Sequence, residues 1–396
     1  MNGVTTPAPL AAAPLRAAVK WALLAGNFVI GCGIMCVVGT LNDLTQSLGV
    51  SVAVGGQLLA LAAAMVCFGA PLLAGWVAGF DRRRLLAAAL LWYGVGHAFC
   101  AVMPSFAALL PVRALTVLGA AVFTPQAAAA IGFMAPPHQR GQAITFIFLG
   151  WSIASVAGVP IAAWMGDAFG WRSAFGAIAV LSLLAAAWVF AVMPDGIKPA
   201  ALSLHAWKQV LTHPLLMAMV AVTALSGAGQ FTLFSYFAPY YKLTLGATAA
   251  QISGLFIWFG AWGLVGNLLV ARGIDRIGAD RSVAITLALM LGSLLLWPLA
   301  QGFAVMAFVL LPWGLGCFSS NSAQQARLGI AAPVLAPALM ALNTSAIYLG
   351  QAAGASSGGW LIAHAGFGWL HMAGAAWMLA AIGMSVWVGR RVVILK

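Results

Sequence analysis

Long stretches of the chain contain no charged residue, and each is long enough to cross a lipid bilayer. A membrane-crossing helix needs about 20 apolar residues, and only helices or closed barrels satisfy their backbone hydrogen bonds in hydrocarbon. The strands of a barrel would alternate apolar and polar residues, and these stretches do not alternate. The pattern therefore predicts membrane-spanning helices. The uncharged stretches cover residues 21–42, 44–80, 85–112, 114–139, 141–166, 173–194, 209–241, 243–271, 282–326 and 328–389.

Turn residues divide the two longest stretches into two spans each. Gln301 and Gly302 separate a ninth span from a tenth, and the Gly-Phe-Gly of residues 366–368 separates an eleventh from a twelfth. Prolines at 104, 136–137 and 194 mark other breaks, because proline removes a backbone donor and clashes with the preceding helical turn. We therefore expect an all-α integral membrane protein with about twelve transmembrane helices.

The composition agrees with a membrane location. The 396 residues are 63% hydrophobic and only 6% charged, whereas about a quarter of the residues in a soluble protein are charged. The net charge of +12 is not a nucleic-acid signal, because the basic residues form short groups between spans instead of a face that follows phosphates. We expect the protein to lie in the inner membrane of a bacterium. The positive-inside rule then places both termini on the cytoplasmic side, with only Arg172 and Lys242 in outside loops.

No motif in the sequence indicates an enzyme, a cofactor or a metal site. HExxH, CxxC and paired carboxylates are missing from the sequence. The first 15 residues lack the charged start and cleavage site of a signal peptide. All five cysteines lie in apolar runs, where packing is their ordinary role, although Cys32 and Cys36 would share a helix face and could hold a soft metal.

The second part of the chain repeats the first. The repeated elements are Asp81-Arg82 with Asp275-Arg276, Gly150 and Gly158 with Gly350 and Gly358, and Phe169-Gly170-Trp171 with Phe367-Gly368-Trp369, at offsets of 194, 200 and 198. Repetition of this kind is typical of transporters built from two related bundles. We predict an N-terminal tail (1–19), two pseudo-symmetric six-helix bundles (20–193 and 214–389) joined by a cytoplasmic linker (194–213), and a C-terminal tail (390–396).

At these residues the chain resembles the major facilitator superfamily, and more narrowly its drug/proton antiporter group with the arabinose-efflux-like permeases. The resemblance covers nearly the whole chain. Family members carry Gly, Asp and Arg in the loop between spans two and three, which latches the cytoplasmic ends of neighbouring helices in the outward-facing state. The matching residues are Gly79, Asp81, Arg82, Arg83 and Arg84, with Asp275, Arg276 and Arg281 in the second-half copy. An ordinary basic cytoplasmic loop would have a similar composition.

Span four carries Arg113, followed by Gly119 and Ala121 as in the family's R-x-x-x-x-x-G-x-A element. Burying a guanidinium in a membrane is costly, so Arg113 is a candidate functional residue facing a cavity. The alternative is that it lies near the outer end of its helix and reaches the lipid headgroups.

Span five resembles the glycine- and proline-rich antiporter element of this group. Gly150, Gly158 and Pro160 would form a kink on which the helix rocks against its neighbours. The spacing Gly158-Val-Pro160 departs from the adjacent Gly-Pro of multidrug antiporters, which leaves sugar-efflux or metabolite-efflux relatives open.

The expected position of the acidic residues limits how protons could be coupled to transport. The chain has no Glu, and its six Asp residues fall in inside loops or at outer helix ends. A mid-membrane carboxylate, the expected proton carrier, is therefore missing. The remaining candidates are Asp43, His97, and Arg113 acting on a neighbour's protonation. His97 could equally be a structural hydrogen-bonding residue.

The resemblance implies a central cavity between the halves. One cation with several amides and aromatic rings fits a neutral or weakly anionic amphiphile. We predict a monomeric secondary transporter that exports a small amphiphilic drug or metabolite in exchange for protons by alternating access. The alternative is a facilitator or importer of sugars or other neutral metabolites. The expected lining residues are Asn27, Arg113, Trp151, Ser152, Ser155, Gln230, Phe231, Phe234, Trp258, Asn321, Tyr348 and Gln351.

Overall fold

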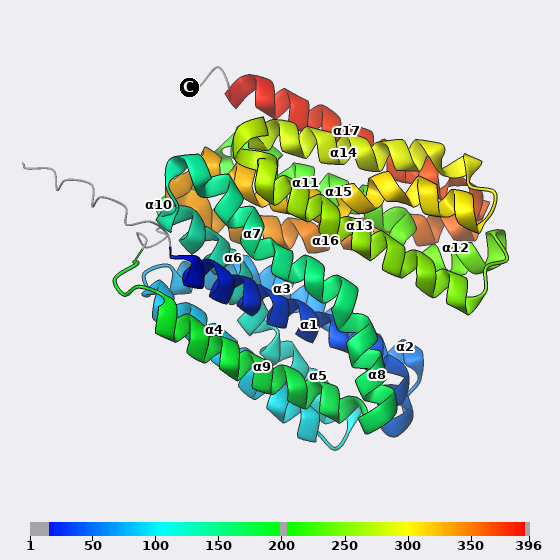
Figure 1. Ribbon diagram of the computed structural model, residues 1–396, viewed down its shortest axis with the longest axis horizontal. Helices are drawn as coiled ribbons and strands as arrows, with labels where there is room; N and C mark the ends of the chain where they lie inside the picture. Colours follow the sequence, from blue (N-terminus) through cyan, green and yellow to red (C-terminus); the bar gives the residue numbers. More distant parts are fainter. Residues whose placement is uncertain (1–15, 199–203, 393–396) are drawn as a thin grey trace, which may run out of the picture.

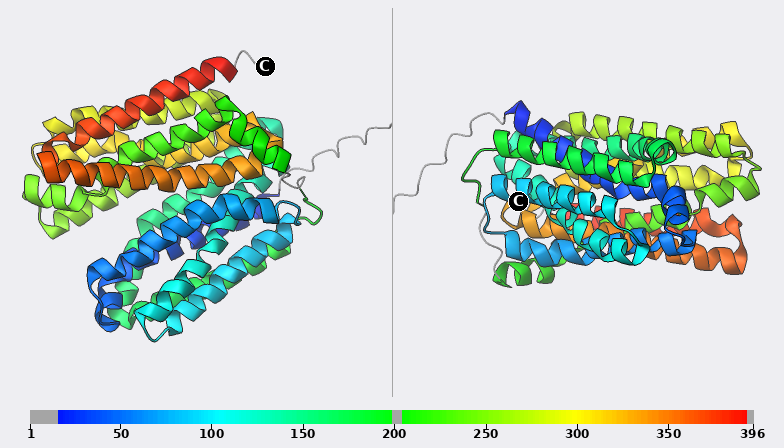
Figure 2. Two further views of the ribbon diagram at one scale, coloured as in Figure 1. Left: turned by 180° about the vertical axis from the view of Figure 1, so that it is seen from behind. Right: turned by 90° about the horizontal axis from the view of Figure 1, so that it is seen from below.

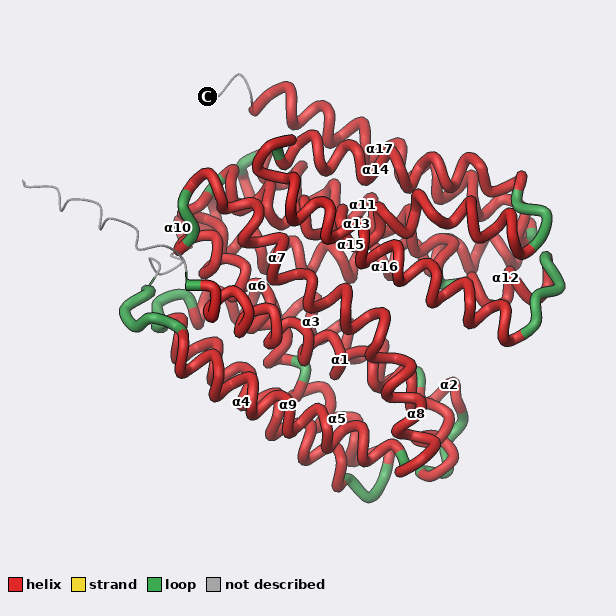
Figure 3. The backbone as a smooth tube through the Cα atoms, viewed as in Figure 1, coloured by secondary structure: helices red, strands yellow, loops and turns green. Residues whose placement is uncertain are grey.

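The computed structural model describes residues 16–198 and 204–392, and these residues form helices joined by short loops, with no strand among them (Figure 3). Twelve helical segments in this part of the chain are long and apolar enough to cross a membrane. The prediction of an all-α membrane protein with twelve spans is thus confirmed. Most of the predicted N-terminal tail and the end of the predicted C-terminal tail lie outside the described residues.

The N-terminal half supplies the first six spans. The fourth span is α5 followed by α6, and the fifth is α7, the short π-helix η2 and α8. The helices are α1 (Ala17–Ser47), α2 (Val52–Gly55), α3 (Gln57–Val77), α4 (Arg82–Val102), α5 (Phe106–Thr116), α6 (Leu118–Met134), η1 (Pro137–Gln139), α7 (Arg140–Ile153), η2 (Ala154–Gly158), α8 (Val159–Phe169) and α9 (Trp171–Val192).

The C-terminal half follows a short linker helix, α10 (Leu204–Thr212). Gly302 and Gly366 precede the tenth and twelfth spans with φ values of 135° and 73°, which glycine adopts without strain. The helices are α11 (Pro214–Phe234), α12 (Phe237–Thr244), α13 (Ala249–Ile277), α14 (Ala279–Leu296), η3 (Trp297–Leu299), α15 (Phe303–Ala331), η4 (Pro333–Leu335), α16 (Ala336–Ala365), η5 (Phe367–Trp369) and α17 (Leu370–Val392).

The two halves form separate bundles that meet at one end of the molecule and diverge towards the other (Figure 1). We call the end where they meet the basic end, because α4 and α7 begin there and α13, α15 and α17 end there. The arginines at these helix ends are Arg82, Arg140, Arg276, Arg327 and Arg390. At the opposite, distal end, the main packing partners of α2, α5, α8 and α12 all belong to their own half. The view from behind shows the same divergence (Figure 2).

Glycines let corresponding helices touch within each bundle. A Cβ atom at Gly150 of α7 would overlap the Leu24 carbonyl oxygen of α1, and one at Gly350 of α16 would overlap the Ala224 carbonyl oxygen of α11. Small residues at helix crossings allow this close approach in membrane proteins. The repeated glycines of the sequence therefore occupy equivalent helix crossings in the two bundles.

Candidate functional site

Arg113 lies inside the N-terminal bundle, where its side chain is only 1% exposed. One guanidinium nitrogen donates to the His97 ring of α4 at 2.8 Å, and another donates to the Gly33 carbonyl of α1 at 2.7 Å. The guanidinium carbon lies 5.7 Å from the centre of the Phe175 ring on α9. The side chain thus joins three helices within one half and does not extend to the protein surface.

The contacts of His97 define its protonation state in this conformation. Arginine has no acceptor, so His97 Nε2 must accept the hydrogen bond from Arg113. The other ring nitrogen, Nδ1, then carries the hydrogen and donates to the Tyr93 carbonyl oxygen at 2.8 Å. His97 is therefore neutral here. Within residues 16–198 and 204–392, Arg113 has no ion pair with a carboxylate.

A second polar group links the first, fourth and fifth spans. Thr124 of α6 donates to the Asn27 side-chain oxygen at 3.0 Å, and the Trp151 indole donates to the Thr124 hydroxyl at 3.5 Å. The Asn27 amide nitrogen donates to the Ile147 carbonyl of α7 at 3.2 Å. The structure thus brings two predicted cavity residues, Asn27 and Trp151, to one threonine. Thr124 was not among the predicted residues, because a lone threonine in an apolar run is not distinctive.

Buried hydrogen bonds connect the two halves at two places, and at one of them the Ser345 hydroxyl of α16 donates to the Cys67 carbonyl of α3. The other lies between α13 and α7. The Asn267 amide of α13 donates to the Ser152 hydroxyl of α7 at 2.7 Å, and both side chains are fully buried. Beside them, Val156 packs against Gly260, where an added Cβ would lie 3.0 Å from a Val156 methyl group. Ser152 was a predicted site residue, but Asn267 was missed, although it is an amide within an uncharged stretch.

Most of the other predicted cavity residues are half-buried. Phe231 and Phe234 lie on α11 with ring centres 5.3 Å apart. Trp258 is 37% exposed, and its indole donates to the Ala307 carbonyl of α15 at 2.8 Å. Their assignment to a substrate cavity remains a prediction. The half-buried members are Trp151, Ser155, Gln230, Phe231, Phe234, Asn321, Tyr348 and Gln351.

The first copy of the predicted latch makes contacts within its own half. Asp81 is the N-cap of α4 and accepts hydrogen bonds from the backbone N–H groups of Arg83 and Arg84, at 3.0 and 3.3 Å. Its second oxygen accepts from the Gly196 N–H at 2.8 Å. Gly79 lies in the turn before this cap. Asp81 therefore fastens the start of α4 to the end of the sixth span.

The side chains of Arg82 and Arg83, which follow Asp81, also form contacts within the N-terminal half. Arg82 is fully buried and donates to the Val77 and Ala78 carbonyls at the end of α3, at 3.0 and 3.1 Å. Arg83 forms an ion pair with Asp195 at 2.6 Å. These contacts satisfy carbonyls that a helix end leaves without partners. Three of the five predicted latch residues of this copy thus have a structural role in this conformation.

The second copy of the latch connects the halves. Asp275, in the last turn of α13, accepts a hydrogen bond from the Gln142 backbone N–H at the start of α7, at 3.0 Å. A carboxylate at a helix N-terminus is favoured by the unpaired N–H groups and the helix dipole. An added Cβ at Gly141 would lie 2.5 Å from the Asp275 carboxylate. Arg276, the next residue, and Arg281 of α14 are exposed.

Asp43 lies at the distal end of α1, apart from the Arg113 and His97 pair. Its carboxylate accepts a hydrogen bond from the Trp171 backbone N–H at 2.5 Å, at the start of α9. The preceding residue, Gly170, has a φ of 80°. Of the three proton-coupling candidates, the structure therefore joins His97 to Arg113 and places Asp43 at a helix start.

The fifth span changes its helical geometry at the predicted kink. Residues Ala154–Gly158 form the π-helix η2, and Pro160 follows in the first turn of α8. Pro160 has no N–H to continue the helical hydrogen bonds, and π-helical turns occur often at functional sites. Gly150 lies in α7 before the π-helix, and Gly158 is the last residue of the π-helix. A moving kink here remains a prediction.

Two repeated six-helix bundles that meet across a partly polar seam define a membrane transport protein. This chain belongs to the major facilitator superfamily, whose family model matches residues 23–334. It is 28% identical to the inner membrane transport protein YdhP of Escherichia coli over 88% of this chain and 89% of that protein. It is 26% identical to a probable sugar efflux transporter of Pasteurella multocida, over 89% and 86% of the two chains.

A solved structure supports the same fold. The crystal structure of the human organic anion transporter MFSD10 matches with a TM-score of 0.77 at 16% sequence identity. The match covers 94% of this chain and all of that one. The protein is therefore a multi-pass membrane protein with the major facilitator fold, and it acts on a small-molecule substrate within a lipid bilayer.

Proposed function

We propose that this protein is a monomeric exporter of the bacterial inner membrane, which exchanges protons for a small amphiphilic drug or metabolite. The observation that carries the proposal is the arrangement of the bundles, which meet at the basic end and diverge at the distal end. By the positive-inside rule the basic end faces the cytoplasm. The structure then corresponds to the outward-facing state of an alternating-access cycle. Similarity to a probable sugar efflux transporter of Pasteurella multocida supports the direction of transport.

The basic end opens when the seam between the halves separates. The polar contacts to be broken are the hydrogen bonds of Asp275 with Gln142, of Ser152 with Asn267, and of Ser345 with the Cys67 carbonyl. Each hydrogen bond of this kind stabilises the closed basic end by about 1 kcal/mol. A small number of such contacts holds the outward-facing state without locking it, so substrate binding can shift the balance.

His97 and Arg113 form the proton-coupling unit of this proposal. In the present state Arg113 occupies the only free lone pair of the imidazole, so a proton binds His97 only when Arg113 withdraws. A protonated imidazole would in turn repel the guanidinium. Proton binding and the position of Arg113 therefore exclude one another, which links protonation to a movement of α5 against α4.

The first test is a susceptibility and metabolite-accumulation panel in an efflux-deficient bacterial host. Wild type should lower the intracellular level of at least one compound, and a protonophore should abolish the effect. Arg113→Ala should abolish export at unchanged membrane abundance, because His97 and the Gly33 carbonyl lose their shared donor. Arg272→Ala is the matched control, since Arg272 is exposed and outside this network.

Two outcomes would contradict the proposal. Accumulation of a solute in place of its removal would favour uptake, and normal export by Arg113→Ala would remove the principal site residue. His97→Gln separates coupling from transport, because glutamine offers Arg113 an acceptor but does not titrate. Export by this variant should lose its dependence on the pH gradient, and an unchanged dependence would exclude His97 as the coupling residue.

A further inference from the structure

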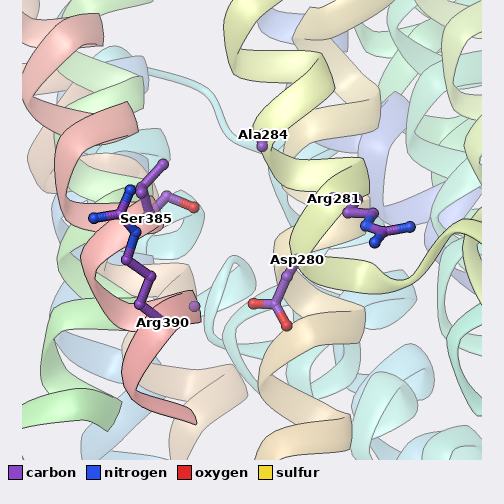
Figure 4. A pocket seen from close by; sticks show the side chains of 7 residues that line it. Asp280, Arg281, Ala284, Ser385 and Arg390 are labelled. Atoms are coloured by element: carbon purple, nitrogen blue, oxygen red, sulfur yellow. The ribbon is translucent and has the colours of Figure 1, made fainter. Parts of the chain in front are cut away.

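A groove lies on the outer surface of the C-terminal half, between α14 and α17 at the basic end (Figure 4). Its volume is about 430 Å³. Figure 4 shows Asp280 between the two helices, Arg390 beside Ser385 along α17, and Arg281 on the other flank of α14. The groove is independent of the seam between the halves. Its lining residues are Asp280, Arg281, Ala284, Ser385, Val386, Gly389 and Arg390.

A buried arginine forms the floor of the groove. Arg327 is 2% exposed, and its Nε lies 2.6 Å from an Asp280 carboxylate oxygen. Its terminal nitrogens donate to the Ser385 hydroxyl and carbonyl, at 3.0 and 3.2 Å. Arg327 thereby joins α14 to α17 from the inside and neutralises Asp280. One carboxylate oxygen of Asp280, Oδ2, has no partner in the described part of the chain.

The two remaining cations of the groove are free. Arg281 and Arg390 are exposed, and within the described ranges neither has a hydrogen-bond or ion-pair partner. Because Asp280 and Arg327 cancel, Arg390 in the groove and Arg281 on the other flank of α14 leave two uncompensated positive charges near this site. The surface of the same helices towards the bilayer is apolar, since Ile285, Val386 and Trp387 are 50%, 41% and 42% exposed.

We propose that this groove binds the headgroup of an anionic phospholipid of the phosphatidylglycerol type. The phosphate would lie against Arg390 with Arg281 on the flank, and a headgroup hydroxyl would donate to the free Asp280 oxygen. The acyl chains would then follow the exposed Val386 and Ile285 side chains. Basic pockets between helices at the cytoplasmic side are the expected sites for anionic lipid headgroups. Because the groove is continuous with an apolar surface, an intact lipid fits it better than a soluble phosphate.

The experiment is native mass spectrometry of the full chain, titrated in detergent with phosphatidylglycerol. The double variant Arg281→Ala with Arg390→Ala should bind this lipid about tenfold more weakly than wild type, since each basic residue near an anionic lipid contributes a several-fold attraction. Arg272→Ala, an exposed arginine near the same end but outside the groove, should bind like wild type. The double variant Arg281→Lys with Arg390→Lys should bind phosphatidylglycerol nearly as tightly as wild type, because it keeps both positive charges.

Competition distinguishes the lipid from other ligands. Phosphatidylcholine and glycerol phosphate should not displace the bound phosphatidylglycerol, because the first lacks net charge and the second lacks acyl chains. Displacement by glycerol phosphate would show a soluble-anion site and overturn the proposal. Equal retention of phosphatidylglycerol by the Ala double variant and wild type, both shown to be folded by circular dichroism, would also overturn it. Neither result depends on whether the protein exports a substrate.

Discussion

The two halves share a backbone plan but enclose different interiors. The N-terminal half surrounds a charge, because Arg113 is held by His97 and the Gly33 carbonyl. The C-terminal half holds its buried Arg327 at the basic end, and nearer the distal end it surrounds aromatic rings, where Trp313 is fully buried with its ring centre 5.3 Å from that of Phe237. A charge held by hydrogen bonds can exchange partners, whereas packed rings resist movement. In the proposed mechanism, the first half carries the switching chemistry and the second half is its rigid counterpart.

The fifth and eleventh spans show the same contrast. In the eleventh, α16 is continuous, and added Cβ atoms at Gly354 and Gly358 would overlap the Ala228 and Thr232 carbonyl oxygens of α11. In the fifth, the π-helix η2 ends at Gly158, where an added Cβ would meet its nearest atom, Cys32 Sγ, at 3.4 Å. At Gly158 the fifth span thus packs less closely against α1 than the eleventh span packs against α11 at Gly358.

The two copies of the Asp-Arg element also form different contacts. Asp81 caps α4 and stays within its half, whereas Asp275 accepts a hydrogen bond from the other half. The sequence difference behind this is Gly278, three residues after Asp275. Its φ of 92° lets α13 end and α14 begin in one residue. The first copy has arginine at the corresponding position, and its chain turns before Asp81 instead of after it.

The largest expected effect comes from matched glycine substitutions in the two spans. Gly358→Ala should lower stability by about 3 kcal/mol, because the new methyl group must push α16 from the α11 backbone. Gly158→Ala, at the corresponding position, should be nearly neutral, since its methyl group meets only ordinary contacts. Thermal unfolding of both purified variants measures the difference. Equal losses would contradict the inferred looseness of the fifth span.

A smaller effect is expected at one buried contact between the halves. Ser152→Ala should cost about 1–2 kcal/mol, because the buried Asn267 amide loses its acceptor. Ser155→Ala is the matched control, since its hydroxyl only donates to Trp151 in its own helix. The thermal midpoint of each variant tests this. A Ser152→Ala protein as stable as Ser155→Ala would show that the seam does not depend on this bond.

The smallest expected effect separates the two aspartates. Asp81→Ala should cost about 1 kcal/mol in unfolding free energy, the usual loss for a helix N-cap. Asp275→Ala should leave unfolding nearly unchanged but open the basic end, because its hydrogen bond joins the halves and is exposed.

The readout for opening is the labelling rate of a cysteine placed at Ala336, beside the seam between the halves, in a background without other cysteines. Loss of one exposed contact worth about 1 kcal/mol should raise this rate about fivefold. Asp81→Ala should leave the rate unchanged. If both variants labelled alike, the two copies of the element would share one role.

Most of the fold was predictable because bilayer thickness and backbone hydrogen bonding leave few alternatives. The uncharged stretches predicted twelve spans, and the turns at Gly302 and Gly366 fall where glycine is needed for a positive φ. The repeats at Gly150 and Gly350 likewise predicted two related bundles, and both glycines lie at close helix crossings. These features depend on local sequence, so they can be predicted without knowing the tertiary structure.

The partners of the site residues depended on packing that no local pattern encodes. The sequence singled out Arg113 and His97, but only the tertiary structure placed them in contact and left Asp43 at another helix start. Asn267 and Thr124 gained their roles from the helices facing them. The sequence by itself determined the membrane location, the number of spans and the twofold repeat, because hydropathy and chain length set these. The tertiary structure decided which polar groups meet, because contacts between helices depend on how distant segments rotate and approach one another.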